Sequence, residues 1–178
     1  MKLASTFIQL ASVVCAAAAV LPRTDCGRLS QAFAEDVVAK FITILNHPDP
    51  AAANATAQAL LADGYQEISD SILSLEGQPL GGITFEGKQG YIEGVLAAPP
   101  VEGITTNEIL VAGSSKILWY WTFYGIGSGE YEVKGFNLFT ITEKGQISTL
   151  NLEFNSIAWG LNTGYQIIFP EGGGAPTK

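Results

Sequence analysis

The second half of the chain alternates apolar and polar positions with a period of two, the spacing of a half-buried β-strand. Four such segments follow one another with almost no helical pattern between them, at 105–112, 116–124, 131–142 and 146–155. Short glycine-containing segments separate them, at 113–115, 125–129 and 143–145. Because consecutive strands joined by short turns form hairpins, this run predicts a curled antiparallel sheet.

The first half of the chain has helical spacing. From Ser30, a residue that can cap a helix, apolar positions recur every three or four residues until Pro48 interrupts the pattern. Asp49 and Pro50 then form a second helix start, an N-cap acceptor followed by a residue tolerated in the first turn. We expect this second helix to run to about Ala62.

A short hairpin and a third helix complete the predicted elements. Branched residues at 65–75 predict a strand, 83–85 a short return partner, and 88–97 a helix that ends before Pro99. Helices that precede a run of strands indicate an α+β fold, with helices covering one face of the sheet. We therefore expect one domain with a curved antiparallel sheet wrapped around the N-terminal helices.

Residues 1–19 have the layout of a secretory signal peptide. Lys2 is followed by an apolar run that ends in small residues, and polar side chains dilute this run too much for a membrane span. We place a flexible segment at 20–29, the folded domain at 30–164 and a C-terminal tail at 165–178, disordered at its end where three glycines follow one another. The mature protein is then secreted and has no integral membrane segment.

Charge and residue counts exclude several classes of function. Removing Lys2 leaves 8 basic and 17 acidic side chains, a formal net charge of −9 that disfavours nucleic acid as a partner. The chain has no glycine loop that cradles phosphate, and its single histidine with the lone mature Cys26 predicts no zinc site. We expect no metal and no cofactor. Cys26 is predicted to be a free thiol or an intermolecular bridge.

The order of elements, together with four segments, resembles the NTF2-like superfamily. The segments are 62–70, 135–141, 144–147 and 153–156 with Trp159. This superfamily includes polyketide cyclases of the SnoaL type, ketosteroid isomerase and scytalone dehydratase, and the last segment is most similar to secreted fungal members. The resemblance covers 30–164 and implies a cone-shaped fold with an apolar pocket for a small organic molecule.

The resemblance also implies positions for acid–base chemistry. In isomerase-like members a carboxylate on the strand after the second helix takes the substrate proton, and an ungapped match places Ser69 there with Asp70 next to it. Because neighbouring strand residues face opposite sides, either Ser69 with Glu67 or Asp70 faces the pocket. Asp70 is the candidate catalytic acid, and Asn137 is the candidate donor to a developing oxyanion. The structural alternatives are a loop-bracing Asp70 and a core amide at Asn137.

The aromatic residues of the predicted pocket wall are Phe41, Trp119, Trp121 and Phe154. The two tryptophans have a simpler explanation as core residues. Phe41 occupies the position at which a steroid isomerase carries a donor tyrosine, and the chain has no pair of histidines for dehydratase chemistry. Both faces of the strand at 116–124 are apolar, so one of them is predicted to form a homodimer.

Three functions remain open from the sequence. The first is a secreted protein that binds a small apolar organic ligand without turnover. The second is a cofactor-free isomerase, cyclase or dehydratase that acts on a natural product by acid–base chemistry. The third is an interaction or dimerisation module with a filled pocket. Desolvation raises the pKa of a pocket carboxyl with or without catalysis, so composition alone does not separate the first two.

Secretion leads to a prediction about covalent processing. Protein from a eukaryotic secretory host should lack the residues up to Ala17 or Ala19 and should carry a glycan at Asn54, which begins the acceptor triplet Asn-Ala-Thr. Intact-mass measurement of the secreted material and of an Asn54→Gln variant tests both points. Retained Lys2, or a mass unchanged by Asn54→Gln apart from the substitution itself, would contradict the respective part.

Overall fold

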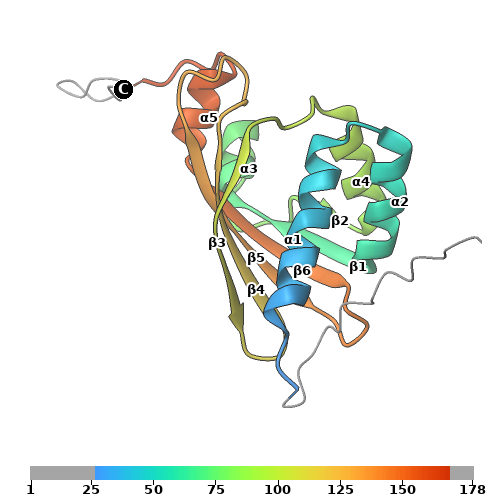
Figure 1. Ribbon diagram of the computed structural model, residues 1–178. Helices are drawn as coiled ribbons and strands as arrows, with labels where there is room; N and C mark the ends of the chain where they lie inside the picture. The colour runs from blue at the N-terminus through green and yellow to red at the C-terminus, as the bar shows by residue number, and fades with distance from the viewer. Residues whose placement is uncertain (1–26, 169–178) are drawn as a thin grey trace, which may run out of the picture.

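The computed structural model describes residues 27–168, which form a curved sheet with helices on its concave side (Figure 1). The predicted signal peptide, the thiol of Cys26 and the end of the tail lie outside the described residues. The described elements, in chain order, are α1 (Gln31–Asn46), α2 (Pro50–Leu60), β1 (Leu61–Ile68), α3 (Asp70–Glu76), β2 (Phe85–Glu86), α4 (Lys88–Ala97), β3 (Ile104–Ala112), β4 (Lys116–Phe123), β5 (Val133–Ile141), β6 (Ile147–Phe154) and α5 (Ser156–Asn162). The α+β class and the cone are confirmed.

The sheet has six strands in the order β2-β1-β6-β5-β4-β3. The pairs from β3 to β6 are antiparallel, as predicted, and β2 returns antiparallel against β1. The pairing of β1 with β6 is parallel, however, so the sheet is mixed rather than purely antiparallel. This pairing joins the two halves of the chain, because β1 precedes β6 by about eighty residues.

Local capping explains where the first two helices begin. The Ser30 side chain accepts a hydrogen bond from the Phe33 N–H, and the Asp49 carboxylate accepts from the N–H groups of Ala51 and Ala52. These bonds satisfy donors that the first helical turn leaves unpaired. The apolar faces of α1 and α4 then pack on the concave side of the sheet around a buried aromatic cluster that includes Phe41, Tyr91 and Phe139.

The predicted strand at 65–75 is wrong in its second half. The strand ends at Ile68, and residues Asp70–Glu76 form the helix α3. The reason is capping: the Ser69 hydroxyl accepts from the Ile72 N–H, and the distant Glu153 carboxylate accepts from the N–H groups of Asp70 and Ser71. Although apolar residues alternate through this segment, its second half forms the helix α3, which the contact with Glu153 stabilises.

Three smaller differences from the predicted elements also have local causes. The second helix ends at Leu60, two residues earlier than expected, because Leu61 already pairs with β6. The helix α5, which the sequence pattern did not indicate, begins where the Asn155 side chain accepts from the Ala158 N–H. Leu29, expected in the flexible segment, is buried and its N–H donates to the Gly113 carbonyl.

Candidate functional site

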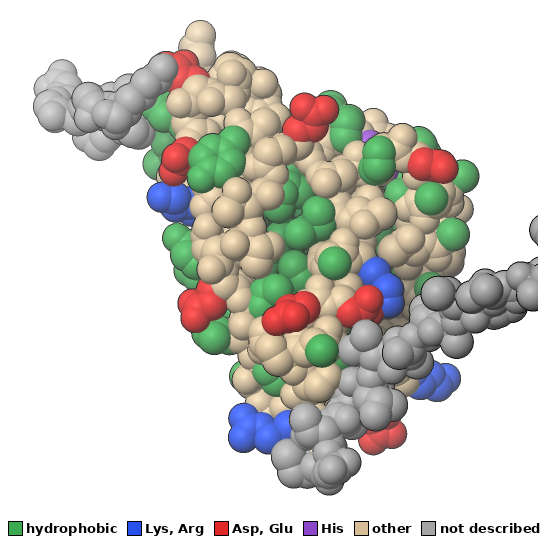
Figure 2. All heavy atoms as spheres, in the orientation of Figure 1, with side chains coloured by type: hydrophobic (Ala, Val, Ile, Leu, Met, Phe, Trp, Pro, Cys, Tyr) green, Lys and Arg blue, Asp and Glu red, His purple; other side chains and the backbone are tan. Residues whose placement is uncertain are grey.

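A cavity of about 660 Å³ lies between the concave face of the sheet and the helices. Figure 2 shows hydrophobic side chains deep between the sheet side and the helix side of the molecule. The sheet contributes Trp121, Phe123, Leu150, Leu152 and Phe154, the helix side contributes Phe41, Tyr91 and Val95, and α3 and α5 supply rim residues such as Ile72 and Trp159. The size is that of pockets that enclose small organic molecules.

Three polar side chains are buried in this largely apolar wall. Glu67, Tyr91 and Asn137 line the cavity, and each is no more than 3 % exposed. They come from β1, α4 and β5, three elements far apart in the sequence. Buried polar groups are costly unless they are paired, so their partners determine what the cavity can do.

Glu67 lines the cavity from β1, the strand next to the edge strand β2. Its strand neighbours are Phe85 on β2 and Leu150 on β6. Burial among these apolar groups raises the pKa of the Glu67 carboxyl to about 8; the nearby Tyr65 hydroxyl acts in the opposite direction, and the Glu76 carboxylate adds to the rise. At neutral pH the carboxyl therefore holds its proton, and it can exchange that proton close to physiological pH.

Tyr65 and Tyr91 form an edge-to-face pair beside Glu67, with ring centroids 4.9 Å apart. Burial raises the pKa of both hydroxyls well above 10, so both stay neutral. The Tyr65 hydroxyl is close enough to Glu67 to affect its pKa, but within residues 27–168 it has no hydrogen-bond partner of good geometry. Tyr91 lines the cavity and Tyr65 does not, so of this pair only Tyr91 borders the space available to a ligand.

Asn137 is held by Trp121. The indole N–H of Trp121 donates to Asn137 Oδ1 over 2.7 Å, in a contact that is buried. The indole reaches this position because residue 135, opposite Trp121 in the sheet, is glycine: a Cβ there would lie 2.5 Å from the ring carbon Cζ2. Phe123 stacks on the same indole, with ring centroids 3.8 Å apart. The ring is therefore fixed on two sides.

The structure brings together five of the eight residues predicted for the site. Five line the cavity, namely Phe41, Glu67, Trp121, Asn137 and Phe154. The other three, Ser69, Asp70 and Trp119, do not line it.

Those three have structural positions instead. Ser69 caps α3, and Asp70 is the first residue of that helix, where its carboxylate accepts from the Gly81 N–H over 2.7 Å. Trp119 is a core residue whose indole N–H donates to Thr106. The predicted placement of Asp70 on a pocket-facing strand is wrong, because Ser69 and Glu153 convert this segment into a helix. Asp70 braces the loop, which was the alternative.

Sequence reasoning did not select Tyr91 or the rim residues of α3 and α5. The helix that carries Tyr91 was predicted with the correct bounds, but nothing in its local pattern shows that Tyr91 lines the cavity whereas Tyr65 does not. The rim contributed by Ile72 and Trp159 depends on two helices that were not predicted at all.

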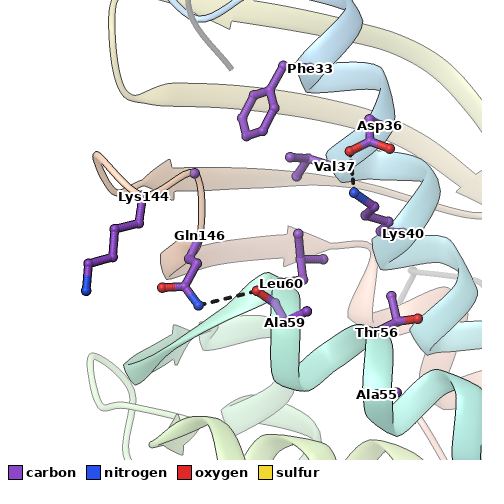
Figure 3. Close-up of a pocket in the computed structure, with 11 residues that line it drawn as sticks. Phe33, Asp36, Val37, Lys40, Ala55, Thr56, Ala59, Leu60, Lys144 and Gln146 are labelled. Atoms are coloured by element: carbon purple, nitrogen blue, oxygen red, sulfur yellow. Dashed lines mark hydrogen bonds and ion pairs between the residues drawn. The ribbon is translucent and has the colours of Figure 1, made fainter. Parts of the chain in front are cut away.

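A second hollow of about 440 Å³ lies outside the cone, between α1, α2 and the turn that joins β5 to β6 (Figure 3). Its polar side chains are largely engaged with one another or with backbone. Lys40 forms an ion pair with Asp36 at 2.6 Å, and the Gln146 amide donates to the carbonyls of Ala59 and Leu61. It presents no buried titratable group, so the cavity of the cone is the better candidate site.

Three further features of the described residues bear on the predicted partners and on the predicted glycosylation. Within 27–168 no helix is long and apolar enough to cross a membrane, and no three side chains of the types that bind metals lie together as a metal site. Asn54 is exposed on α2, the accessibility that an attached glycan requires. Glycosylation itself stays a prediction.

A curved sheet that encloses an apolar cavity under N-terminal helices defines a class of cone-shaped α+β proteins. The sequence profile of the NTF2-like domain matches residues 27–166, and the chain belongs to this family. The likeness to secreted fungal members in particular stays a prediction. No curated protein sequence matches the chain.

Solved structures have the same fold at low sequence identity. A SnoaL-like protein of unknown function from Burkholderia thailandensis is 18% identical, with a TM-score of 0.55 over 72% of this chain and 98% of that one. A steroid delta-isomerase from Pseudomonas aeruginosa is 15% identical, with a TM-score of 0.52 over 75% and 90%. An NTF2-like protein of unknown function from Burkholderia pseudomallei is 16% identical, with a TM-score of 0.55 over 74% and 98%. At such identities the likeness shows the fold alone.

The raised pKa of Glu67 predicts a pH-dependent stability. Below pH 4.5 the carboxyl is protonated in both states, whereas between 4.5 and about 8 it ionises only in the unfolded chain. The free energy of unfolding therefore falls as the pH rises through this window, by at most about 1.4 kcal/mol per pH unit. Glu67→Gln, which cannot ionise, should match the wild type near pH 4 and exceed its stability by at most about 5 kcal/mol at pH 8.

Urea unfolding at a series of pH values measures this difference. Glu86→Gln is the matched control, because Glu86 is exposed on the neighbouring strand β2 and its removal should change the pH profile little. A difference between Glu67→Gln and the wild type that stays constant from pH 4 to 8 would contradict a raised pKa at Glu67.

Proposed function

We propose that this protein binds a small, largely apolar organic molecule inside its cone, outside the cell after removal of residues 1–19. The observation that carries the proposal is the cavity of about 660 Å³, whose wall combines aromatic and aliphatic side chains with the three buried polar groups Glu67, Tyr91 and Asn137. An apolar wall supplies affinity through burial, while a few polar groups orient the ligand.

Filling the cavity should abolish binding without unfolding the protein. Leu152 lies on the cavity floor opposite Asn137, so a Leu152→Trp substitution places an indole in the ligand space. Leu80→Trp is the matched control, because Leu80 is 64 % exposed and does not line the cavity. We expect ligand that co-purifies with the wild type to be present in the control and at least tenfold reduced in Leu152→Trp.

Native mass spectrometry of the secreted protein gives the readout, and thermal unfolding checks that both variants are folded. Equal amounts of co-purifying ligand in folded Leu152→Trp and in the control would place the ligand outside the cone and refute the proposal.

Acid–base catalysis is a second candidate function, favoured by Glu67. A carboxyl with a pKa of about 8 in an apolar cavity is suited to accept a proton from a carbon atom next to a carbonyl group and to return it elsewhere. Glu67 replaces Asp70 in this role because Glu67 lines the cavity and Asp70 does not. Tyr91 and Asn137 lie in the same wall, where their N–H and O–H groups can stabilise negative charge on the carbonyl oxygen.

Proton transfer is measurable without knowing the natural substrate. With 2-tetralone in D₂O, deuterium exchange next to the carbonyl should be saturable, should increase as the pH rises through about 8 and should be lost in Glu67→Gln. The ¹H NMR signal of the exchanging position reports the rate. The Leu152→Trp variant, whose cavity is filled, gives the background rate of exchange. If the wild type exchanges deuterium into 2-tetralone no faster than this variant, the protein does not catalyse proton transfer on the probe, and binding is left as the function.

The outer face of the sheet supports the proposal of a homodimer. Phe136 and Leu110 are about half exposed there, and Tyr120 stacks on Phe136 with ring centroids 4.8 Å apart. On the neighbouring strands Glu108 pairs with Tyr120 and Glu153 pairs with Phe136, so a glutamate flanks the aromatic pair on each side. Apolar surface of this kind on a sheet face is typical of an interaction site.

Replacing the centre of this face should produce a monomer. Phe136→Lys introduces a charge at the stack, whereas Ile157→Lys makes the same kind of change at an exposed position on α5, away from the outer face. We expect light scattering coupled to size-exclusion chromatography to report a dimer for the wild type and Ile157→Lys, and a monomer for Phe136→Lys. A monomeric wild type would contradict the dimer.

A further inference from the structure

The hydrogen bond between Trp121 and Asn137 determines which end of the Asn137 amide faces the cavity. An indole N–H can only donate, so the amide atom 2.7 Å from Trp121 Nε1 must be the oxygen. This assignment follows from the chemistry of the donor and does not depend on distinguishing amide oxygen from nitrogen.

The amide nitrogen is left for a ligand. Among residues 27–168, Asn137 Nδ2 has no protein hydrogen-bond partner, and it is not one of the fully enclosed unpaired atoms. Since Asn137 itself lines the cavity, its N–H groups reach the ligand space. The protonated Glu67 and the Tyr91 hydroxyl can each donate or accept a hydrogen bond. Of these three buried polar groups, Asn137 is therefore the one that the protein itself fixes as a hydrogen-bond donor toward the ligand.

The indole cannot easily release the amide. It packs closely against Gly135 and stacks on Phe123, and Trp121 is 1 % exposed. If the amide rotated by half a turn, its nitrogen would face the indole N–H, leaving two donors opposed and a buried bond lost. Such a loss costs far more than a solvent-exposed bond would.

We propose that Trp121 is a specificity-determining positioning residue: by holding Asn137 Oδ1, it makes the cavity select neutral apolar molecules that carry a hydrogen-bond acceptor, such as a ketone or lactone oxygen, at the Asn137 position. This inference rests on the proposed binding function and names the chemical class of its ligand. A ligand with only a donor at that position would meet Nδ2–H and lose a hydrogen bond.

Three planar tricyclic probes of nearly the same shape separate the possibilities. They are 9-fluorenone, which carries a carbonyl acceptor, fluorene, which carries a methylene group, and carbazole, which carries an N–H donor. For the wild type we expect fluorenone to bind roughly tenfold more tightly than fluorene, and carbazole to bind no better than fluorene. Quenching of tryptophan fluorescence or calorimetry gives the three Kd values.

The test variant is Trp121→Phe, which keeps an aromatic ring but removes the N–H. The amide of Asn137 can then turn either end toward the cavity, so the ratio of the fluorene and fluorenone Kd values should fall toward one and carbazole should gain affinity. Trp119→Phe is the matched control, because it removes an indole N–H from the same strand, where the partner is Thr106 rather than a cavity residue. It should keep the wild-type order.

A measurement on the wild type keeps the test decisive even if Trp121→Phe does not fold. The side-chain NH₂ signals of Asn137, identified by their loss in Asn137→Leu, should shift in ¹⁵N NMR spectra on addition of fluorenone and much less on addition of fluorene. Equal shifts with both probes, or an unchanged order of Kd values in folded Trp121→Phe, would overturn the role of Trp121 while leaving the binding function intact. Failure of all three probes to bind the wild type would instead count against the binding function itself.

Discussion

The parallel pairing of β1 with β6 is the contact on which the cavity depends. It places Glu67 beside Leu150, and Leu150 pairs in turn with Phe139 on β5. Residues in register across neighbouring strands share a face, so the inward side of β1 continues the inward side of the C-terminal strands. Without this pairing β1 and β2 would not extend the sheet, and Glu67 would not face the rest of the cavity wall.

The pairing of β1 with β6 also affects the rim of the cavity. The Glu153 carboxylate at the end of β6 accepts hydrogen bonds from the first N–H groups of α3, just after β1 ends. A carboxylate at a helix N-terminus satisfies unpaired donors and interacts favourably with the helix dipole. The short helix that follows contributes Ile72, Leu75 and Glu76 to the cavity. The strand pairing thus sets both the floor of the site and one side of its mouth.

The polar groups of the wall are arranged in two ways. Asn137 accepts one hydrogen bond from Trp121 through its amide oxygen, which fixes the amide nitrogen as the donor toward the cavity. Glu67 lacks a strong partner, so burial dominates and its pKa rises to about 8. One group is therefore suited to orienting a ligand and the other to exchanging a proton, and both remain buried at some cost in stability.

Local sequence patterns were sufficient to predict the helix starts at Ser30 and Asp49, the helix over 88–97 and the four C-terminal strands, because caps, breakers and the spacing of apolar residues act over a few residues. The cone followed from this order of elements together with the family resemblance. The family resemblance, combined with the alternation of strand residues, indicated Asn137, Trp121, Phe41 and Phe154 as pocket residues, and left Glu67 and Asp70 as alternatives for the pocket-facing acid. The resemblance supplied the family.

The choice between Glu67 and Asp70 as the acid of the cavity depended on contacts between distant parts of the chain. The alternation through 65–75 is consistent with a continuing strand, and the local pattern does not reveal that Glu153, more than eighty residues later, stabilises a helix there. The parallel pairing of β1 with β6, the orientation of the Asn137 amide and the placement of Tyr91 likewise depend on contacts between distant segments. Propensity and periodicity describe residues that are close in the sequence, whereas these contacts join distant segments and contribute to stability only after the chain has folded.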